Sequence, residues 1–505
     1  MAAELELRGI TKRFGAVLAN DAVDLSVEAG DIHAVVGENG AGKSTLMSIL
    51  YGLLPPDDGT IAVRGEETTF ASPLEAIEAG LGMVHQSFQL FPTMSVAENV
   101  VFRREPTRRG LIDRSASVAA VHRLAEAYGL SVDPTAAVED LSVGVLQRVE
   151  ILKALYRDAR VLILDEPTAV LTPQERDRLF EVLRLLRADG RTIVFITHKL
   201  GEVMTISDRV TVLRRGRSVA DLVTAETTAT EISHHMTGRN VELTRSPPMT
   251  RPGPPVLTVG GLFVVDDHGL EAVGGVDITV RAGEIVGLAG VAGNGQSELV
   301  EAITGLRPAA EGRVRLGEAD ITSSDVASRR RAGMAYIPED RHRVGTARAA
   351  TVEDNLLMGF QSTPSIATRG WLDLAAVAEH ANALVARFDV KVSSMSDPVG
   401  TLSGGNLQKV VVAREMAHEA PLLIAEQPTR GVDVGAIEFV HAQLTSFRDA
   451  GGAVLLVSAE LSEIQTLSSR ILVMFEGSLV AELDPDEVTE VDIGLHMTGS
   501  GAAHA

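Results

Sequence analysis

Residues 37–44 form a glycine-rich segment whose spacing suits the binding of a phosphorylated ligand. It matches G-x-x-x-x-G-K-[ST] and reads Gly37, Glu38, Asn39, Gly40, Ala41, Gly42, Lys43 and Ser44. Glycines let the backbone approach phosphates and turn its N–H groups toward them. The Lys43 ammonium can reach the β- and γ-phosphates of a nucleotide, and the Ser44 hydroxyl can bind Mg²⁺. The motif therefore predicts a nucleotide-binding loop, and the alternative is an ordinary glycine-rich turn.

Two acidic residues and a histidine further along the chain could complete a phosphate-hydrolysing site. Asp165 and Glu166 follow the apolar run 161–164, and His198 follows the run 192–196. A carboxylate at the end of a buried strand can hold Mg²⁺ through water. The next carboxylate can act as the general base for water that attacks a γ-phosphate. The alternatives are an acidic turn and a structural histidine, and the upstream phosphate loop favours the catalytic interpretation.

Three other positions have both a functional and a structural interpretation. Phe14 precedes the phosphate loop and could stack on a base, although a core aromatic is an equal alternative. The amide of Gln86 could ligate Mg²⁺ and orient water, or it could be plain polar surface. Residues 141–148 open a helix with small residues and Ser142, which suits a phosphate and equally suits an ordinary N-cap.

The elements that must position these residues alternate between strands and helices. Residues 32–36 are predicted to be a buried strand that enters the phosphate loop, and residues 44–50 a helix that leaves it. Helical periodicity over 173–189 precedes the β-branched run 192–196. This alternation favours a mostly parallel sheet flanked by helices. The segment 95–156 is helix-rich and is predicted to be an inserted helical subdomain.

The composition predicts a large globular protein with more than one domain. The chain has 505 residues, a formal net charge of −22 and no cysteine. This acidity disfavours nucleic acid as a partner, because such binding relies on Lys and Arg. The N-terminus lacks the pattern of a signal peptide, and we find no uncharged apolar run long enough to span a membrane. We therefore expect any membrane association to pass through a partner.

The sequence repeats itself once. The loop around Gly37 recurs around Gly290, 253 positions later, and the acidic end of 161–166 recurs in 422–427, 261 positions later. Near-constant offsets indicate a duplicated domain. We predict a first domain at 1–245, a stiff proline-rich linker at 246–255, a second domain at 256–498 and a short tail at 499–505.

The second copy has lost the residues that could do chemistry. Its loop keeps Gly290, Gly295 and Ser297 but carries neutral Gln296 in place of Lys43. The other altered positions are Glu339, Glu426, Gln427 and Ala459, which stand for Gln86, Asp165, Glu166 and His198. Glutamine cannot accept a proton at neutral pH, so Gln427 is not a general base. The helix-opening motif also differs between the copies, since it reads Ser403, Gly404, Gly405 and Asn406 in the second copy and carries Val143 and Val145 in the first.

Together these motifs resemble the ATP-binding subunits of ABC transporters, twice over nearly the whole chain. The resemblance implies two tandem P-loop ABC ATPase domains of α/β class, each a mostly parallel sheet with flanking helices and a helical subdomain. It implies ATP and Mg²⁺ as cofactors. The implied roles are adenine stacking for Phe14, the Walker A loop for Gly37 to Thr45, the Q-loop and Mg²⁺ contact for Gln86, Walker B for Asp165, the base for Glu166 and the switch histidine for His198.

Within that family, one chain with two such domains is similar to the ATPases of ribose, galactose and xylose importers and of their nucleoside-importing relatives. Residues 337–341 are typical of this group, and residues 141–155 and 168–175 are closest to the nucleoside branch. The resemblance implies two membrane-spanning permease subunits, docked near Gln86, and indirectly an extracytoplasmic substrate-binding protein. It also implies a location on the cytoplasmic face of the cell membrane.

ABC domains pair head to tail by the same resemblance, so that each ATP lies between one Walker A loop and the other domain's signature. One implied site joins the intact first-copy residues to Ser403, Gly404, Gly405 and the loop of Asp433. The other joins the altered second-copy residues to the interrupted signature and to Thr172, which replaces Asp433. We therefore expect one hydrolytic site and one site that at most holds nucleotide.

Two other classes of function remain open at this stage. A soluble tandem ABC protein acting on ribosomes would typically carry a long charged helical linker and two hydrolytic sites, unlike this chain. A nucleotide-binding regulator is disfavoured by the complete set of residues around Glu166.

Overall fold

A computed structural model describes residues 3–15, 17–85, 88–168, 171–238, 252–291 and 293–498. The chain divides into two compact units, Met1–Val241 and Glu242–Ala505, and each is described by itself. Gln86, most of the predicted linker (246–251) and the predicted tail (499–505) lie outside the described residues. Pro255, the last residue of that predicted linker, already belongs to a strand of the second unit.

The first unit is built around a six-stranded sheet that is parallel except for one edge strand. Its order is β12 (Arg217–Val223), β11 (Arg209–Arg214), β3 (Ile32–Val36), β10 (Thr192–Ile196), β9 (Val161–Asp165) and β6 (Leu81–Val84). β12 alone pairs antiparallel, with β11. The predicted parallel sheet, with strands at 32–36 and 192–196, is confirmed.

Helices cover this sheet because both of its faces are apolar. They are α1 (Lys43–Leu50), α2 (Pro73–Glu78), α3 (Val96–Val101), α4 (Arg114–Ala127), α5 (Val143–Tyr156), α6 (Pro173–Ala188), α7 (Leu200–Ile206) and α8 (Ala229–Thr237), with short 3₁₀ turns at Val138–Asp140 and Thr224–Glu226. Along β9, Leu162 and Leu164 join the cluster formed with α3, α5 and α6, whereas Val161 and Ile163 join the cluster with α1. α3, α4 and α5 confirm the predicted helical segment.

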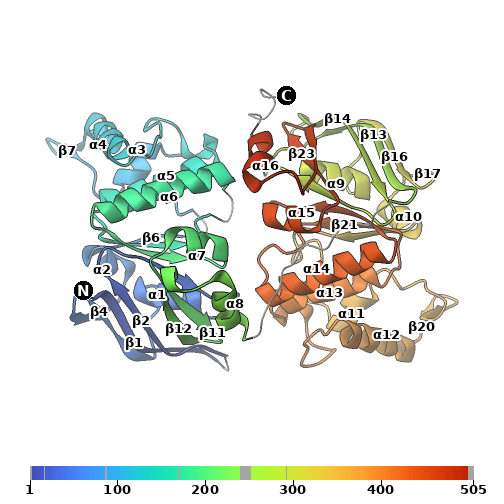
Figure 1. The fold of residues 1–505 in the computed structure, drawn as a ribbon, viewed down its shortest axis with the longest axis horizontal. Coiled ribbons are helices and arrows are strands. Elements are labelled where there is room, and N and C mark those ends of the chain that lie inside the picture. Colours follow the sequence, from blue (N-terminus) through green and yellow to red (C-terminus); the bar gives the residue numbers. More distant parts are fainter. Residues whose placement is uncertain are drawn as a thin grey trace. The chain divides into compact units, whose positions relative to one another are not determined.

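A second, antiparallel sheet in the same unit is missing from the sequence-based prediction. Its order is β2 (Val17–Glu28), β1 (Ala3–Phe14), β4 (Asp58–Val63) and β5 (Glu66–Thr68). It packs with α1 over one face of the central sheet, opposite α5 and α6 (Figure 1). β1 and β2 are long and half-buried, so their alternating pattern is weaker than the continuous apolar runs of the central strands. A small hairpin of β7 (Thr107–Arg108) and β8 (Leu111–Ile112) interrupts the helical segment.

The second unit repeats this plan. Its central sheet has the order β18 (Met334–Ile337), β21 (Leu422–Glu426), β22 (Ala453–Val457), β15 (Ile285–Ala289), β23 (Arg470–Phe475) and β24 (Ser478–Leu483). Its antiparallel sheet has the order β14 (Glu271–Arg281), β13 (Pro255–Val265), β16 (Glu311–Leu316) and β17 (Ala319–Asp320), and β19 (Ala367–Thr368) and β20 (Trp371–Leu372) form its hairpin. The helices are α9 (Gln296–Thr304), α10 (Val326–Arg331), α11 (Val352–Leu357), α12 (Leu374–Arg387), α13 (Gly404–Met416), α14 (Val434–Asp449), α15 (Leu461–Leu467) and α16 (Glu490–Met497), with a 3₁₀ turn at Val399–Thr401.

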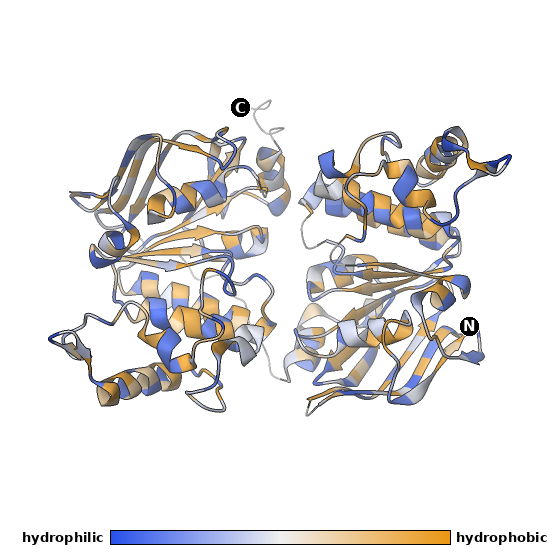
Figure 2. Ribbon diagram, turned by 180° about the vertical axis from the view of Figure 1, so that it is seen from behind, coloured by the Kyte–Doolittle hydropathy of each residue, from blue (hydrophilic) through white to orange (hydrophobic). Residues whose placement is uncertain are grey.

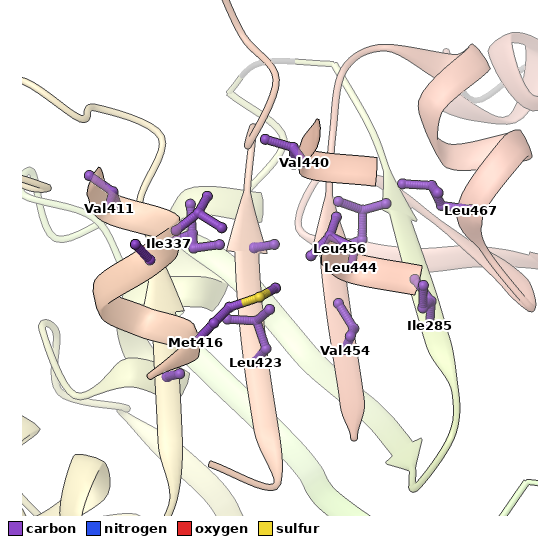
Figure 3. Packing of buried hydrophobic residues seen from close by; sticks show 14 of the residues in the cluster. Ile285, Ile337, Val411, Met416, Leu423, Val440, Leu444, Val454, Leu456 and Leu467 are labelled. Carbon is purple, nitrogen blue, oxygen red and sulfur yellow. The ribbon is translucent and has the colours of Figure 1, made fainter. Parts of the chain in front are cut away.

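The central strands of the second unit show how the core is filled. Leu423 of β21 lies beside Met416 of α13, and Leu456 of the neighbouring strand β22 lies beside Leu444 of α14 (Figure 3). The outer helices carry alternating hydrophobic and hydrophilic stripes, as expected for helices that cover one face of a sheet (Figure 2). None of the helices in the described part of the chain combines the length and the apolar character needed to cross a bilayer.

Candidate functional site

The phosphate loop of the first unit joins the end of β3 to the start of α1. Gly42 caps α1 with φ 101°, and Gly40 has φ 82°, both in the left-handed region. A Cβ atom on Gly42 would lie 2.4 Å from the Ala19 carbonyl oxygen, so no larger residue fits there. The loop therefore presents backbone atoms and not side chains, and the positive end of the α1 dipole completes it as an anion-binding surface.

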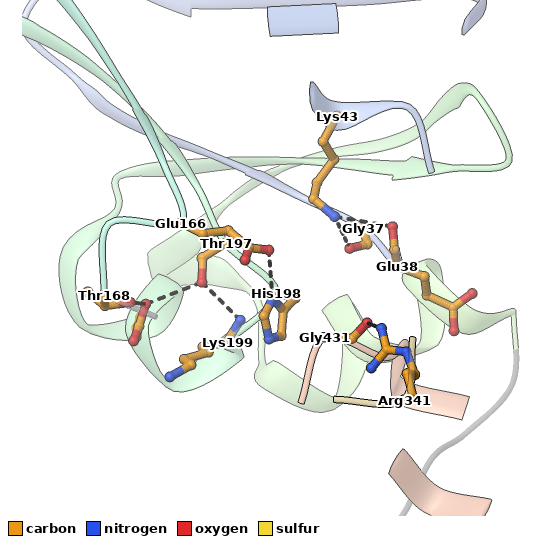
Figure 4. Close-up of polar contacts among 11 residues, drawn as sticks. Gly37, Glu38, Lys43, Glu166, Thr168, Thr197, His198, Lys199, Arg341 and Gly431 are labelled. Atoms are coloured by element: carbon orange, nitrogen blue, oxygen red, sulfur yellow. Dashed lines mark hydrogen bonds and ion pairs between the residues drawn. The ribbon is translucent and has the colours of Figure 1, made fainter. Parts of the chain in front are cut away.

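Lys43 is held over this loop although it is almost fully buried. Its Nζ donates to the carbonyl oxygens of Gly37, at 2.6 Å, and Glu38, at 3.1 Å (Figure 4). Burial lowers the pKa of Lys43, while the charges of Glu166 and Asp165 act to raise it. The structure thus brings the predicted loop lysine close to the predicted acidic pair.

The acidic pair stands at the end of β9, as the sequence predicts. Glu166 has φ 47°, a left-handed conformation that costs a non-glycine residue about 1–3 kcal/mol, and its N–H donates to the Ile196 carbonyl oxygen at 3.0 Å. The neighbouring strand β10 therefore fixes the backbone turn that carries Glu166. Burial and the adjacent Glu166 raise the pKa of Asp165 to about 6, and Lys43 opposes that rise.

His198 pairs directly with Glu166. Its Nδ1 lies 2.9 Å from Glu166 Oε1. Burial acts to raise the pKa of Glu166, but the His198 hydrogen bond and the charges of His198, Lys43 and Lys199 together lower it. Glu166 is consequently ionised in the neutral range and able to accept a proton.

A buried polar cluster beneath this pair is absent from the sequence-based prediction. Glu202 Oε2 accepts hydrogen bonds from Thr168 Oγ1 at 2.7 Å and Thr197 Oγ1 at 3.2 Å (Figure 4). Thr197 Oγ1 in turn accepts from the Lys199 N–H at 3.0 Å. The cluster ties the segment after β9 to the segment that carries His198. The repeat offers a signal for it, because Thr429 and Glu463 recur at the offset of 261.

We expect Glu202→Ala to lower the free energy of unfolding by about 1–3 kcal/mol, because it removes the acceptor of two buried hydroxyls. Thr168 and Thr197 are 3% and 2% exposed, so water does not replace that acceptor. Denaturant unfolding of the full chain measures the change. Glu181→Ala, on the exposed face of α6, is the matched control and should change stability by less than about 0.5 kcal/mol. Equal effects of the two substitutions would contradict the structural role of Glu202.

The remaining predicted residues of the first unit lie in different settings. The Ser44 side chain is exposed at the start of α1, and Thr45 beside it is partly buried. Phe14 ends β1 with 47% of its surface exposed, which contradicts the core alternative and leaves its ring available for stacking. Gln86 lies outside the described residues.

The second unit keeps the backbone conformation of this site, but other side chains stand in place of Lys43, Glu166 and His198. Gly295 caps α9 with φ 97°, and Gln427 has φ 45°, with its N–H donating to the Val457 carbonyl oxygen at 2.7 Å. The Gln427 side chain accepts from the Ala459 N–H at 3.0 Å, so a backbone amide stands in the place of His198. The Gln296 amide lies against Gly290, where a Cβ atom would be 1.7 Å from Nε2.

The predicted signature opens α13 and packs against the start of α14. Ser403 caps α13, and Asn406 Nδ2 donates to its hydroxyl at 3.0 Å. A Cβ atom on Gly405 would lie 2.8 Å from Asp433 Oδ2, and a Cβ atom on Gly404 would lie 3.2 Å from Arg341 Nη2. The small residues therefore allow close packing of the signature against its neighbours.

Arg341 binds the loop that leads to Asp433, a role that the sequence did not indicate. Its guanidinium donates to the carbonyl oxygen of Arg430 at 2.6 Å. It also donates to the carbonyl oxygen of Gly431 at 3.0 Å (Figure 4). Glu339 forms an ion pair with Arg430. Residues 339–341 are thus tied to the loop that leads to Asp433.

Comparison with known proteins places this geometry in a family. The sequence pattern of the family described as "ABC transporter" matches residues 20–169 and 273–430, and the chain belongs to that family. It is 46% identical to the glucose import ATP-binding protein TsgD13 of Haloferax volcanii, over 99% of this chain and 96% of that protein. It is 45% identical to the guanosine import ATP-binding protein NupO of Bacillus subtilis, over 98% of this chain and 97% of that protein.

A solved structure also matches both units. It is an archaeal ribosome recycling factor in complex with a ribosomal stalk protein, with a TM-score of 0.62 and 20% sequence identity, over 94% of this chain and 90% of that chain. At that identity the likeness concerns the fold alone. It agrees with the predicted fold of two tandem ABC ATPase domains.

Proposed function

We propose that this chain is the ATP-binding and ATP-hydrolysing subunit of an ABC importer that carries nucleosides or simple sugars. The observation that carries the proposal is the Glu166–His198 pair beside the Lys43 loop, in a chain that matches import ATP-binding proteins over nearly its whole length. A general base next to a phosphate loop suits hydrolysis of a nucleoside triphosphate.

The first unit supplies the chemistry in this proposal. Lys43 moves from the loop carbonyls to the β- and γ-phosphates, which compensate its charge better than neutral oxygens do. Glu166 accepts a proton from the attacking water, and His198 holds the Glu166 carboxylate in place and contacts the γ-phosphate. The exposed ring of Phe14 stacks on the adenine.

The donor set of the first unit fits Mg²⁺ bound to a nucleotide. Ser44 offers a hydroxyl oxygen and Asp165 a partly exposed carboxylate, the hard oxygen ligands that this ion prefers. Gln86 is proposed as a third contact. When bound, Mg²⁺ neutralises phosphate charge.

The second unit contributes its signature rather than a base. We propose that Ser403, Gly404, Gly405 and Asn406 close over the nucleotide of the first unit in a head-to-tail pair of units. The Asp433 loop, which Arg341 supports, completes that surface. The altered residues of the second unit, with Gln427 in place of the base, do not hydrolyse ATP.

The partners follow from the same proposal. Two membrane-spanning permease subunits form the path for the cargo, and an extracytoplasmic binding protein delivers it. The chain then acts on the cytoplasmic face of the cell membrane. A ribosome-directed function has less support, because TsgD13 and NupO, which match nearly the whole chain, are named for import, and the likeness to the ribosome recycling factor extends only to the fold.

Uptake measurements test the proposal. Cells whose only copy carries Glu166→Gln are supplied with labelled guanosine, glucose or ribose, and Glu181→Gln serves as a matched exposed control. We expect uptake of one cargo to fall to background in the first strain and to stay normal in the control. Loss of guanosine uptake alone identifies the nucleoside branch, and unchanged uptake of all three contradicts the proposed cargo classes.

A further inference from the structure

Glu426 in the second unit stands where Asp165 stands in the first, but in a different environment. Both residues end the strand that precedes the base position, β21 and β9 respectively. Glu426 is longer by one methylene and only 5% exposed, whereas Asp165 is partly exposed. Mg²⁺ keeps several of its waters when a carboxylate holds it, so the site must admit water. The burial of Glu426 works against this.

Hydrogen bonds within the protein already engage the Glu426 carboxylate. The Tyr336 hydroxyl donates to Glu426 Oε2 at 2.6 Å, and Ser297 at the start of α9 also hydrogen-bonds to Glu426. Tyr336 lies on β18, which pairs directly with β21. The matching residue of the first unit, 253 positions earlier, is Met83 on β6, which has no hydroxyl to donate.

The charges around the second loop also differ from those of the first. Neutral Gln296 replaces Lys43, and Glu298 replaces Thr45. Burial raises the pKa of Glu426, and the charges of Glu301 and Glu298 add to that rise. The second loop therefore lacks the cation that would draw a triphosphate and, with it, a metal ion into place.

We propose that the Tyr336–Glu426 pair takes the place of a divalent cation in the second unit, so that a nucleotide-loaded chain holds one Mg²⁺ and not two. The donor set of the second unit does not fit Mg²⁺, because its carboxylate is buried and bonded to an uncharged hydroxyl. This inference rests on the proposed function only in assigning the single ion to the first unit.

Manganese binding to the full chain tests the proposal. Mn²⁺ substitutes for Mg²⁺, and electron paramagnetic resonance counts the ions bound per chain in the presence of a non-hydrolysable ATP analogue. We expect one ion per wild-type chain, and we expect Lys43→Ala to weaken its binding by roughly 10- to 150-fold, in step with the weaker binding of the nucleotide. Two ions per wild-type chain would overturn the proposal. No bound ion in the wild type would instead contradict the proposed function of the first unit.

Restoring the residues of the first unit gives a second, independent test. One variant carries Gln296→Lys and Glu298→Thr, and a second adds Tyr336→Met and Glu426→Asp. We expect the first variant to keep one Mn²⁺ per chain and the second to bind two. A wild-type circular dichroism spectrum and unfolding midpoint for each variant show that the second unit, which carries all four substitutions, is folded. A second variant that still binds one ion, or a first variant that binds two, shows that the Tyr336–Glu426 pair is not what excludes the cation.

Discussion

Glu166→Gln is expected to lower ATP turnover at least 100-fold, the order of effect that a lost general base produces. The substitution changes one atom of the carboxylate and removes its ability to accept a proton at neutral pH. The fold should tolerate it, because Gln427 already occupies the equivalent backbone turn at φ 45° in the second unit. Steady-state phosphate release by the purified chain with its membrane partners measures the effect.

Gln427→Ala is the matched control for this prediction. It removes the side chain that accepts from the Ala459 N–H, but it removes no group that can act as a base. We expect ATP turnover to change less than about two-fold, because the substitution leaves the general base of the first unit unchanged. If both substitutions halve turnover, the two sites hydrolyse ATP equally and the one-site mechanism is wrong.

Lys43→Ala is expected to weaken ATP binding by roughly 10- to 150-fold, which corresponds to about 1.5–3 kcal/mol for a charged hydrogen bond. Lys43 is 6% exposed, so its ammonium meets the phosphates with little screening by water. The loss should appear as a higher dissociation constant for a fluorescent ATP analogue at equilibrium.

Gln296→Ala is the corresponding control in the second unit. The Gln296 amide carries no charge, and we expect the dissociation constant of the hydrolytic site to stay within about three-fold of the wild-type value. An equal loss of affinity in both variants would show that the second loop also binds ATP tightly. Both chains should keep wild-type unfolding midpoints, which separates a binding defect from misfolding.

The sequence by itself determined the fold class and most of the candidate site. The central strands are buried on both faces, so they stand out as continuous apolar runs, and the phosphate loop and Asp165–Glu166 follow such runs directly. Duplication gave an internal comparison, which separated the intact residues from Gln296, Gln427 and Ala459. Local sequence carries this information because each motif is held within a few residues of one strand end.

Only the tertiary structure decided what joins residues that lie far apart in the chain. The antiparallel sheet depends on pairing between β1 and β4, whose half-buried strands give a weak pattern. The Glu202 cluster, the contacts of Arg341 and the Tyr336–Glu426 bond each join segments that meet only after the parallel strands align. Such contacts depend on side-chain reach across neighbouring strands, and spacing along the chain does not encode that distance.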